Sequence, residues 1–87
     1  MPYVTVYYQG HKVEYVPLHE GAHKRKWTVE QNGETFHVHE SHGEHTGTYL
    51  YDLYRATSPG SGRWLFQESD IPSLDGVARV ICDTVYV

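Results

Sequence analysis

The dipeptide Asn32-Gly33 lies between two runs in which apolar and polar residues alternate, and it limits the possible folds more than any other feature. Asn-Gly is typical of the type I′ turn of a two-residue β-hairpin, because both central residues need a positive φ. This pairing puts four apolar residues on one face: Trp27, Val29, Phe36 and Val38. It puts polar residues on the other face: Lys26, Thr28, His37 and His39. A slip of one residue would exchange the faces, so turn and pattern predict the register together.

The segment before this hairpin predicts a second one around Gly10. Residues 4–8 and 12–16 alternate, and the loop is either Gln9-Gly10 or Gly10-His11. Either loop places the apolar side chains of both strands on one face. Pro17 is expected to end the second strand because it has no N–H for the ladder, and residues 18–22 are expected to form a loop.

Two more strands are predicted after the hairpin around Asn32-Gly33, over residues 48–56 and 63–67. A loop rich in glycine, serine and proline separates them. Trp64 and Phe66 fall on one face of the second of these strands, and we assign both side chains to the core.

The hydrophobic period changes to that of a helix near the end of the chain. Ser69 or Asp70 is expected to cap this helix, and Pro72 suits its first turn. Four apolar residues recur at helical spacing: Leu74, Val77, Ala78 and Ile81. Gly76 within the helix suggests close packing on the sheet, and Asp75 and Arg79 are spaced as an i,i+4 ion pair. A strand over residues 77–87 is the competing interpretation, and residues 84–87 are a candidate for a short last strand.

These elements predict a single α+β domain over residues 1–87. Antiparallel β-hairpins form a twisted sheet of five to seven strands, with one C-terminal helix packed on a face. The predicted core consists of Val4, Val6, Val13, Tyr15, Trp27, Val29, Phe36, Val38, Leu50, Leu53, Trp64, Phe66, Leu74, Val77, Ala78 and Ile81.

Charge and cysteine content narrow the possible partners and the compartment. The formal net charge is −4, so the chain has no overall basic field that attracts nucleic acid. Cys82 is the only cysteine, which excludes an internal disulfide and a zinc site built from several cysteines. The sequence shows neither a secretion signal nor an apolar run of membrane-spanning length, so a cytoplasmic location is expected.

A histidine cluster is the clearest candidate for a metal site. His37 and His39 are two residues apart on a predicted strand and therefore point to the same side, about 6.5–7 Å apart. His42 or His45 on the following turn would supply a third imidazole for zinc or nickel. The alternative is a solvated strand face and loop tip without bound metal.

A basic segment, Lys24, Arg25 and Lys26, runs into Trp27 and is a candidate nucleic-acid contact. Basic side chains would contact phosphates and the indole would stack on a base. The alternative is an ordinary strand end in which Arg25 pairs with Glu40 across the hairpin.

The residues offer little for catalysis, so we expect no enzyme. Ser41 beside His42, and Cys82 with any histidine, are the candidate pairs of nucleophile and base. Neither nucleophile lies in a nucleophile elbow or at an electropositive helix start, and no glycine-rich phosphate loop is present.

Eight tyrosines in 87 residues exceed what a small core absorbs, and tyrosine is typical of protein interfaces. We therefore predict a non-catalytic protein that binds another macromolecule, foremost a protein. The candidate contacts are Tyr3, Tyr7, Lys24, Arg25, Lys26, Tyr49 and Tyr54. One specific form of this prediction is a small phage- or plasmid-encoded inhibitor. The alternatives are a metal-binding module and a weak nucleic-acid binder that uses the basic segment.

Overall fold

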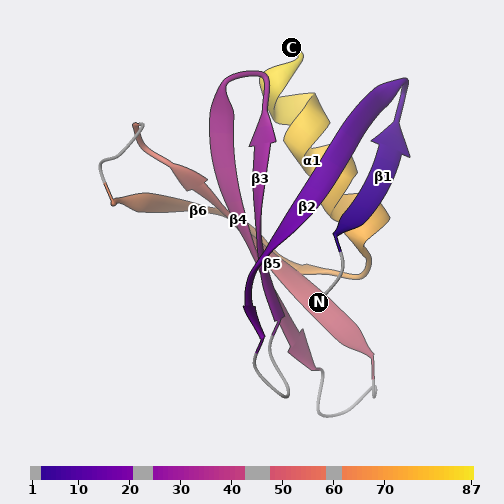
Figure 1. Cartoon of the computed structure of the whole chain (residues 1–87), viewed down its shortest axis with the longest axis vertical. Helices are drawn as coiled ribbons and strands as arrows, with labels where there is room; N and C mark the ends of the chain where they lie inside the picture. The colour runs from indigo at the N-terminus through magenta and orange to yellow at the C-terminus, as the bar shows by residue number, and fades with distance from the viewer. Residues whose placement is uncertain (1–2, 21–24, 43–47, 59–61) are drawn as a thin grey trace.

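The computed structural model describes residues 3–20, 25–42, 48–58 and 62–87, without the side chains of residues 19, 20 and 42. Within them the chain forms six strands and one helix (Figure 1). The strands are β1 (Val4–Tyr8), β2 (His11–Glu20), β3 (Arg25–Gln31), β4 (Glu34–His42), β5 (Tyr49–Ala56) and β6 (Trp64–Ile71). The helix, α1, spans Leu74–Val85.

The described strands form one open antiparallel sheet in the order β1-β2-β3-β4-β5-β6, and α1 packs on one face of it. The helix lies mainly against β1 and also touches β3, β5 and β6, as Figure 1 shows behind the upper part of the sheet. This arrangement confirms the predicted α+β fold. We call the face that carries α1 the inner face and the opposite one the outer face.

The central hairpin has the predicted register. Trp27 pairs with Val38 and Val29 with Phe36, and the turn residues Asn32 and Gly33 have φ values of 50° and 79°. The hairpin of β1 and β2 pairs Tyr8 with His11, which selects Gln9-Gly10 as its loop. The side chain of Asn32 also donates to the carbonyl of Val85 at 2.7 Å, so the hairpin tip binds the C-terminal end of α1.

The C-terminal segment is a helix, and the competing strand over residues 77–87 is wrong. Ser73 rather than Ser69 or Asp70 is the N-cap, and its hydroxyl accepts from the amide of Gly76 at 3.0 Å. A Cβ on Gly76 would lie 2.9 Å from Ile71 Cγ2, which explains a glycine here. The helix continues to Val85, so the predicted last strand is absent from this segment.

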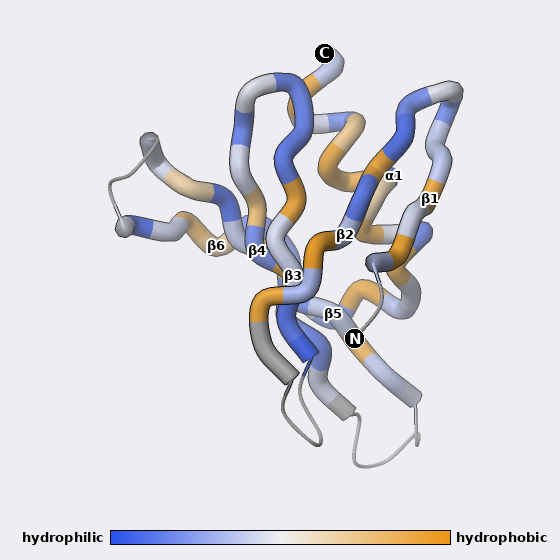
Figure 2. The backbone as a smooth tube through the Cα atoms, viewed as in Figure 1, coloured by the Kyte–Doolittle hydropathy of each residue, from blue (hydrophilic) through white to orange (hydrophobic). Residues whose placement is uncertain are grey.

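The core lies between the inner face and α1. Most of the predicted core residues are buried there. Figure 2, coloured by hydropathy, shows apolar segments of the strands beside apolar segments of α1. Tyr51, Ile71 and Cys82 join the core, although the predicted set did not include them. The ion pair Arg79–Asp83, 3.8 Å apart, takes the place of the expected pair of Asp75 and Arg79.

Two predicted features of the strands are wrong. Pro17 does not end β2, which continues to Glu20, so residues 18–20 extend the strand, and residues 21 and 22 of the predicted loop lie outside the described residues. The described pairing of β2 with β1 ends at Tyr15, and β2 shifts register against β3 between Pro17 and His19, where the missing N–H is tolerated.

Trp64, Phe66 and Leu50 were predicted in the core but are not buried. Trp64 and Phe66 are 37% and 57% exposed, and Leu50 is half-buried. Phe66 pairs with Tyr54, which pairs with His37, so all three side chains share the outer face. The hairpin of β5 and β6 therefore presents its aromatic rings away from the helix.

The helix α1 has 12 residues. The described part of the chain contains no helix with the length and hydropathy needed to span a bilayer.

Candidate functional site

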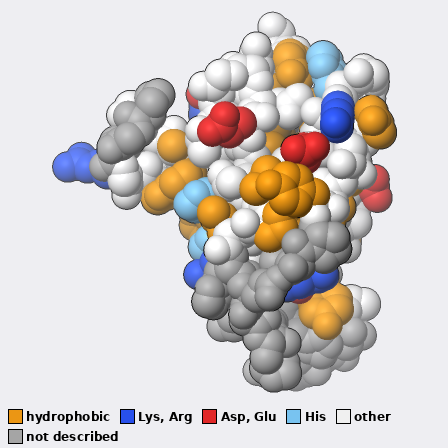
Figure 3. Space-filling view, viewed as in Figure 1, with side chains coloured by type: hydrophobic (Ala, Val, Ile, Leu, Met, Phe, Trp, Pro, Cys, Tyr) orange, Lys and Arg blue, Asp and Glu red, His pale blue; other side chains and the backbone are white. Residues whose placement is uncertain are grey.

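Five rings from three neighbouring strands meet on the outer face. We call them the outer-face cluster: His37, His39, Tyr54, Trp64 and Phe66. The strands are β4, β5 and β6, and the alternation of each strand sends these side chains to the same side. In Figure 3, hydrophobic and histidine side chains gather where the β5–β6 hairpin leaves the body of the molecule.

The rings of the cluster contact one another in a chain. His37 stacks on Trp64 with ring centroids 3.6 Å apart, and His39 lies against Tyr54 at 4.8 Å. Tyr54 meets Phe66 edge to face at 5.8 Å. Aromatic pairs in these arrangements hold one another in place beyond the effect of burial alone. The cluster is therefore an ordered surface of rings rather than a set of separate side chains.

The end of the β5–β6 hairpin is apolar on both faces. Leu65 pairs with Arg55 on the inner face, beyond the cover of the helix, and is 54% exposed. Three consecutive large apolar residues, Trp64, Leu65 and Phe66, thus face solvent on an edge strand. Exposed apolar surface of this kind in a small protein is typical of a binding site.

The predicted tyrosine contacts do not form one site. Tyr3 and Tyr7 are 61% and 70% exposed and belong to the β1 side of the sheet, at the opposite edge from β6. Tyr49 is 48% exposed, and the Arg25 guanidinium lies 6.0 Å from its ring. Only Tyr54 belongs to the outer-face cluster.

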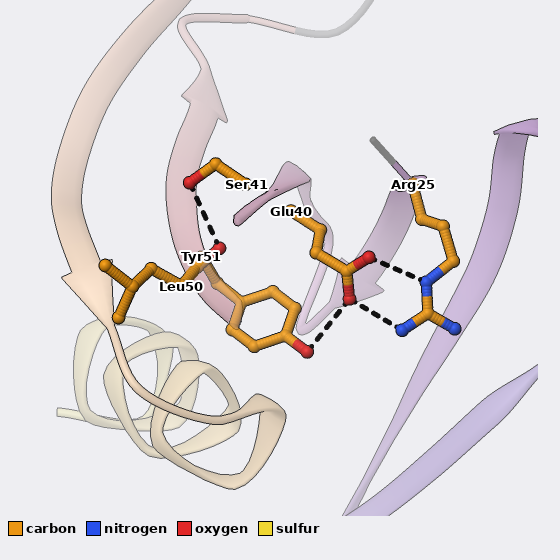
Figure 4. Close-up of polar contacts among 5 residues, drawn as sticks. All are labelled: Arg25, Glu40, Ser41, Leu50 and Tyr51. Atoms are coloured by element: carbon orange, nitrogen blue, oxygen red, sulfur yellow. Dashed lines mark hydrogen bonds and ion pairs between the residues drawn. The ribbon is translucent and has the colours of Figure 1, made fainter. Parts of the chain in front are cut away.

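The basic segment contains a structural ion pair. Arg25 donates to both oxygens of Glu40, at 2.8 and 2.6 Å (Figure 4). This is the ion pair across the hairpin that the alternative interpretation of the segment predicted. The hydroxyl of Tyr51 donates to the same carboxylate at 3.0 Å. Burial, and then the bond to Glu40, raise the pKa of Tyr51 to about 12. The bond to Glu40 also raises the pKa of Arg25.

The other members of the basic segment offer a nucleic acid little. Trp27 is fully buried, so its indole cannot stack on a base. Lys24 lies outside the described residues, and Lys26 is half-buried on the outer face opposite His39.

The structure describes the side chains of two of the four predicted metal ligands, His37 and His39. The rings of His37 and His39 are 6.5 Å apart and lie against Trp64 and Tyr54 respectively. In the described part of the chain, no three His, Cys, Asp or Glu residues converge on a point that suits a metal ion. The side chain of His42 and all of His45 lie outside the description, so zinc or nickel binding stays a prediction.

The histidines of the cluster should make stability depend on pH. Burial is the largest cause that lowers the pKa of both His37 and His39, and the charge of Lys26 lowers both further. For His37 the neighbouring His39 adds repulsion, whereas Asp52 partly opposes the shift of His39. The unfolded chain then takes up these protons more readily than the folded one. Stability is therefore expected to fall as the pH drops below about 6.5.

Thermal unfolding of wild type and a His37→Gln/His39→Gln variant between about pH 5 and 8 tests this expectation. The variant should lose less thermal stability over this range than wild type. Equal losses in both proteins would contradict a contribution from these two imidazoles.

The candidate nucleophiles are poorly placed for chemistry. Cys82 is buried against the core, and burial raises the pKa of its thiol, which disfavours the reactive thiolate. The hydroxyl of Ser41 donates to the carbonyl of Leu50 at 3.5 Å (Figure 4). A hollow between β6 and α1 is lined by Glu68, Pro72, Arg79, Asp83 and their neighbours, a set without histidine or cysteine.

No protein-family model, curated protein or solved structure matches this chain.

Sequence reasoning missed Trp64, Leu65 and Phe66 as surface residues. The available signal was the run of three consecutive apolar residues before the polar residues 67–70. A strand with one buried face alternates, and this run does not. Such a run belongs either to a strand covered on both faces or to an exposed binding edge.

Proposed function

We propose that this chain is a non-catalytic protein whose outer-face cluster binds another protein. The observation that carries the proposal is two groups of ring contacts on the outer face, His39 with Tyr54 and Phe66, and His37 with Trp64. The two histidine rings, 6.5 Å apart, bring these groups side by side, and Trp64 and Phe66 are exposed. Tryptophan and tyrosine provide large contact areas with few rotatable bonds, and they dominate the energetics of protein interfaces.

Charge favours a protein over a nucleic acid as the partner. The net charge is −4, and the outer face carries acidic residues near the cluster, including Asp52 opposite His39. Arg25 is held by Glu40. Among the described residues, Lys26 on β3, opposite His39, and Arg63, which precedes Trp64, are the cations next to the cluster. A nucleic-acid surface with exposed rings would need more basic groups to neutralise phosphates.

The proposal keeps Tyr54 from the predicted contact set and moves the contact surface away from Tyr3, Tyr7 and the basic segment to the β4–β6 side of the sheet. A cytoplasmic location is part of the proposal, because the single cysteine, Cys82, is a free buried thiol. The specific form, a phage- or plasmid-encoded inhibitor, stays a prediction, and its partner would have to accept an acidic molecule through an apolar patch.

The test compares what wild type and two variants retain from a lysate of the cells in which the protein occurs. A Tyr54→Ala/Trp64→Ala variant removes two rings of the cluster, and a Tyr3→Ala/Tyr7→Ala variant is the matched control at the other edge. We expect a protein that wild type and the control retain equally and that the cluster variant retains at least about 30-fold less, since interface hot spots cost about 2 kcal/mol or more each. Equal retention by all three proteins would overturn the assignment of the surface, and no specific retention by wild type would overturn the function.

A further inference from the structure

The outer edge of β6 is unprotected over residues 64–66. β6 is the last strand of the sheet, and no other strand in the described part of the chain pairs with its free side. Edge strands normally carry lysine, proline or a bulge that blocks pairing with another chain. Residues 64–70 of β6 are all exposed, and the two register shifts add their extra residues to β6 after Phe66. Trp64, Leu65 and Phe66 are therefore the regularly paired part of the edge, without lysine, proline or a bulge.

The backbone groups that face this free edge can be assigned. The amide of Thr57 donates to the carbonyl of Arg63 at 3.1 Å, so Thr57 and Arg63 form a hydrogen-bonded pair. Antiparallel ladders alternate hydrogen-bonded and non-hydrogen-bonded pairs, so Leu65 bonds to β5 whereas Trp64 and Phe66 do not. The N–H and C=O groups of Trp64 and Phe66 therefore point away from the sheet.

We propose that a second copy of this chain pairs its β6 antiparallel with the free edge of β6. In the proposed register, Trp64 lies opposite Phe66 of the second copy, and the two-fold axis passes between the two Leu65 residues. This register brings together the outward-facing backbone groups of both strands and forms four hydrogen bonds. It joins two six-stranded sheets into one continuous sheet with isologous symmetry.

The side chains of β6 are self-complementary in this register. Trp64 and Phe66 of the second copy share the outer face and form an aromatic cross-strand pair, twice by symmetry. Leu65 meets its own copy on the inner face. Arg63 at one end of the strand lies opposite Gln67 of the second copy, and Glu68 is the residue that follows Gln67, so each arginine has an acidic residue nearby at both ends of the interface. These matches favour a second copy over an unrelated strand.

The shape of the molecule permits this contact. The end of the β5–β6 hairpin projects from the body of the molecule (Figures 1 and 3), which leaves β6 accessible to a second hairpin. The interface involves one strand from each copy and belongs to the small class of interfaces. We therefore expect a dissociation constant in about the micromolar range or weaker.

A single cysteine at the two-fold axis tests the register directly. In the proposed pairing the two Leu65 residues form a non-hydrogen-bonded pair, with Cα atoms about 4.5 Å apart, which suits a disulfide. A Leu65→Cys variant should form a covalent dimer on oxidation, whereas Tyr7→Cys at the opposite edge is the matched control and should stay monomeric. The native Cys82 is buried and should not react. Equal cross-linking of both variants, or none of Leu65→Cys, would overturn the proposal.

Sedimentation equilibrium of the unmodified chain tests the association itself. Phe66→Pro removes an outward-facing N–H but no bond to β5, whereas Phe66→Val keeps the N–H. We expect wild type and Phe66→Val to dimerise as concentration rises, and Phe66→Pro to associate at least tenfold more weakly than Phe66→Val. A wild type that stays monomeric, or a proline variant that associates like the valine variant, would overturn the proposal. If Phe66→Pro fails to fold, as judged by circular dichroism, the cysteine variants decide.

The two proposals fail separately. Self-association is measured with the purified chain alone, whereas binding to another protein is measured with Tyr54→Ala/Trp64→Ala in a lysate. A chain that stays monomeric but retains a protein through its cluster would overturn the dimer and leave the proposed function supported.

Discussion

Replacement of Trp27 with alanine is expected to destabilise the domain by about 3–5 kcal/mol, a large part of the stability of a domain of this size. Trp27 is fully buried between Tyr15 and Tyr51, with ring centroids 6.2 and 6.1 Å away. Its removal leaves a cavity at the centre of the inner face, where the sheet and α1 have no further side chain to fill it. Urea unfolding followed by circular dichroism measures the loss.

A Trp27→Phe variant separates the effect of volume from that of the polar indole nitrogen. Nε1 of Trp27 is buried and has no hydrogen-bond partner among the described residues. A buried donor without a partner costs about 1–3 kcal/mol, and phenylalanine removes that cost together with part of the volume. We therefore expect Trp27→Phe to lose less than half of what Trp27→Ala loses. A loss under about 1 kcal/mol for Trp27→Ala would contradict its central place in the core.

The hairpins could be predicted because each has a local rule that agrees with its hydrophobic pattern. Asn32-Gly33 requires a tight turn, and the alternation on both sides allows only one register with all apolar residues inward. The helix was predicted for the same reason, since the spacing of its apolar residues matches the buried face that α1 presents. Because the turn type and the hydrophobic period agree, each residue on the inner face of β3 and β4 could be predicted.

The orientation of β6 could not be predicted from its pattern. The loop before it is long, and a run with apolar residues at three consecutive positions has no preferred face. The face of Trp64 and Phe66 follows instead from the pairing of β6 with β5, in which Phe66 lies opposite Tyr54. Two register shifts, between Leu53 and Tyr54 and between Tyr51 and Leu53, each add one residue to β6, so together they restore the alternation and Ile71 lies in the core.

The candidate site was predicted only in part for the same reason. The alternation of apolar and polar residues predicts which face of the strand carries His37 and His39, and the sequence predicts both as metal ligands. It also predicts Tyr54 as a partner contact. Their contact with Trp64 and Phe66 depends on the pairing of β5 with β6, which is a non-local property of the fold. The burial of Trp27, in contrast, followed from the pattern and removes the aromatic part of the predicted nucleic-acid contact.

Loss of the guanidinium of Arg25 is the second large effect that we expect. An Arg25→Met variant should lose about 3 kcal/mol, because it leaves the carboxylate of Glu40 buried without its charged partner. The side chain of Glu40 is 2% exposed, whereas that of Arg25 is 43% exposed, so most of the cost falls on the carboxylate. The hydroxyl of Tyr51 remains as a donor but carries no charge. Methionine keeps an apolar side chain of similar length, but it removes the guanidinium carbon that lies 5.1 Å from the centroid of the Trp27 ring, so this contact is lost together with the charge and the hydrogen bonds.

The double variant Arg25→Met/Glu40→Gln decides whether the buried charge causes this loss. Glutamine keeps the shape of Glu40 and an oxygen for Tyr51, so the double variant should be more stable than Arg25→Met alone. A double variant less stable than Arg25→Met would show instead that Arg25 acts through the contact of its guanidinium with the Trp27 ring.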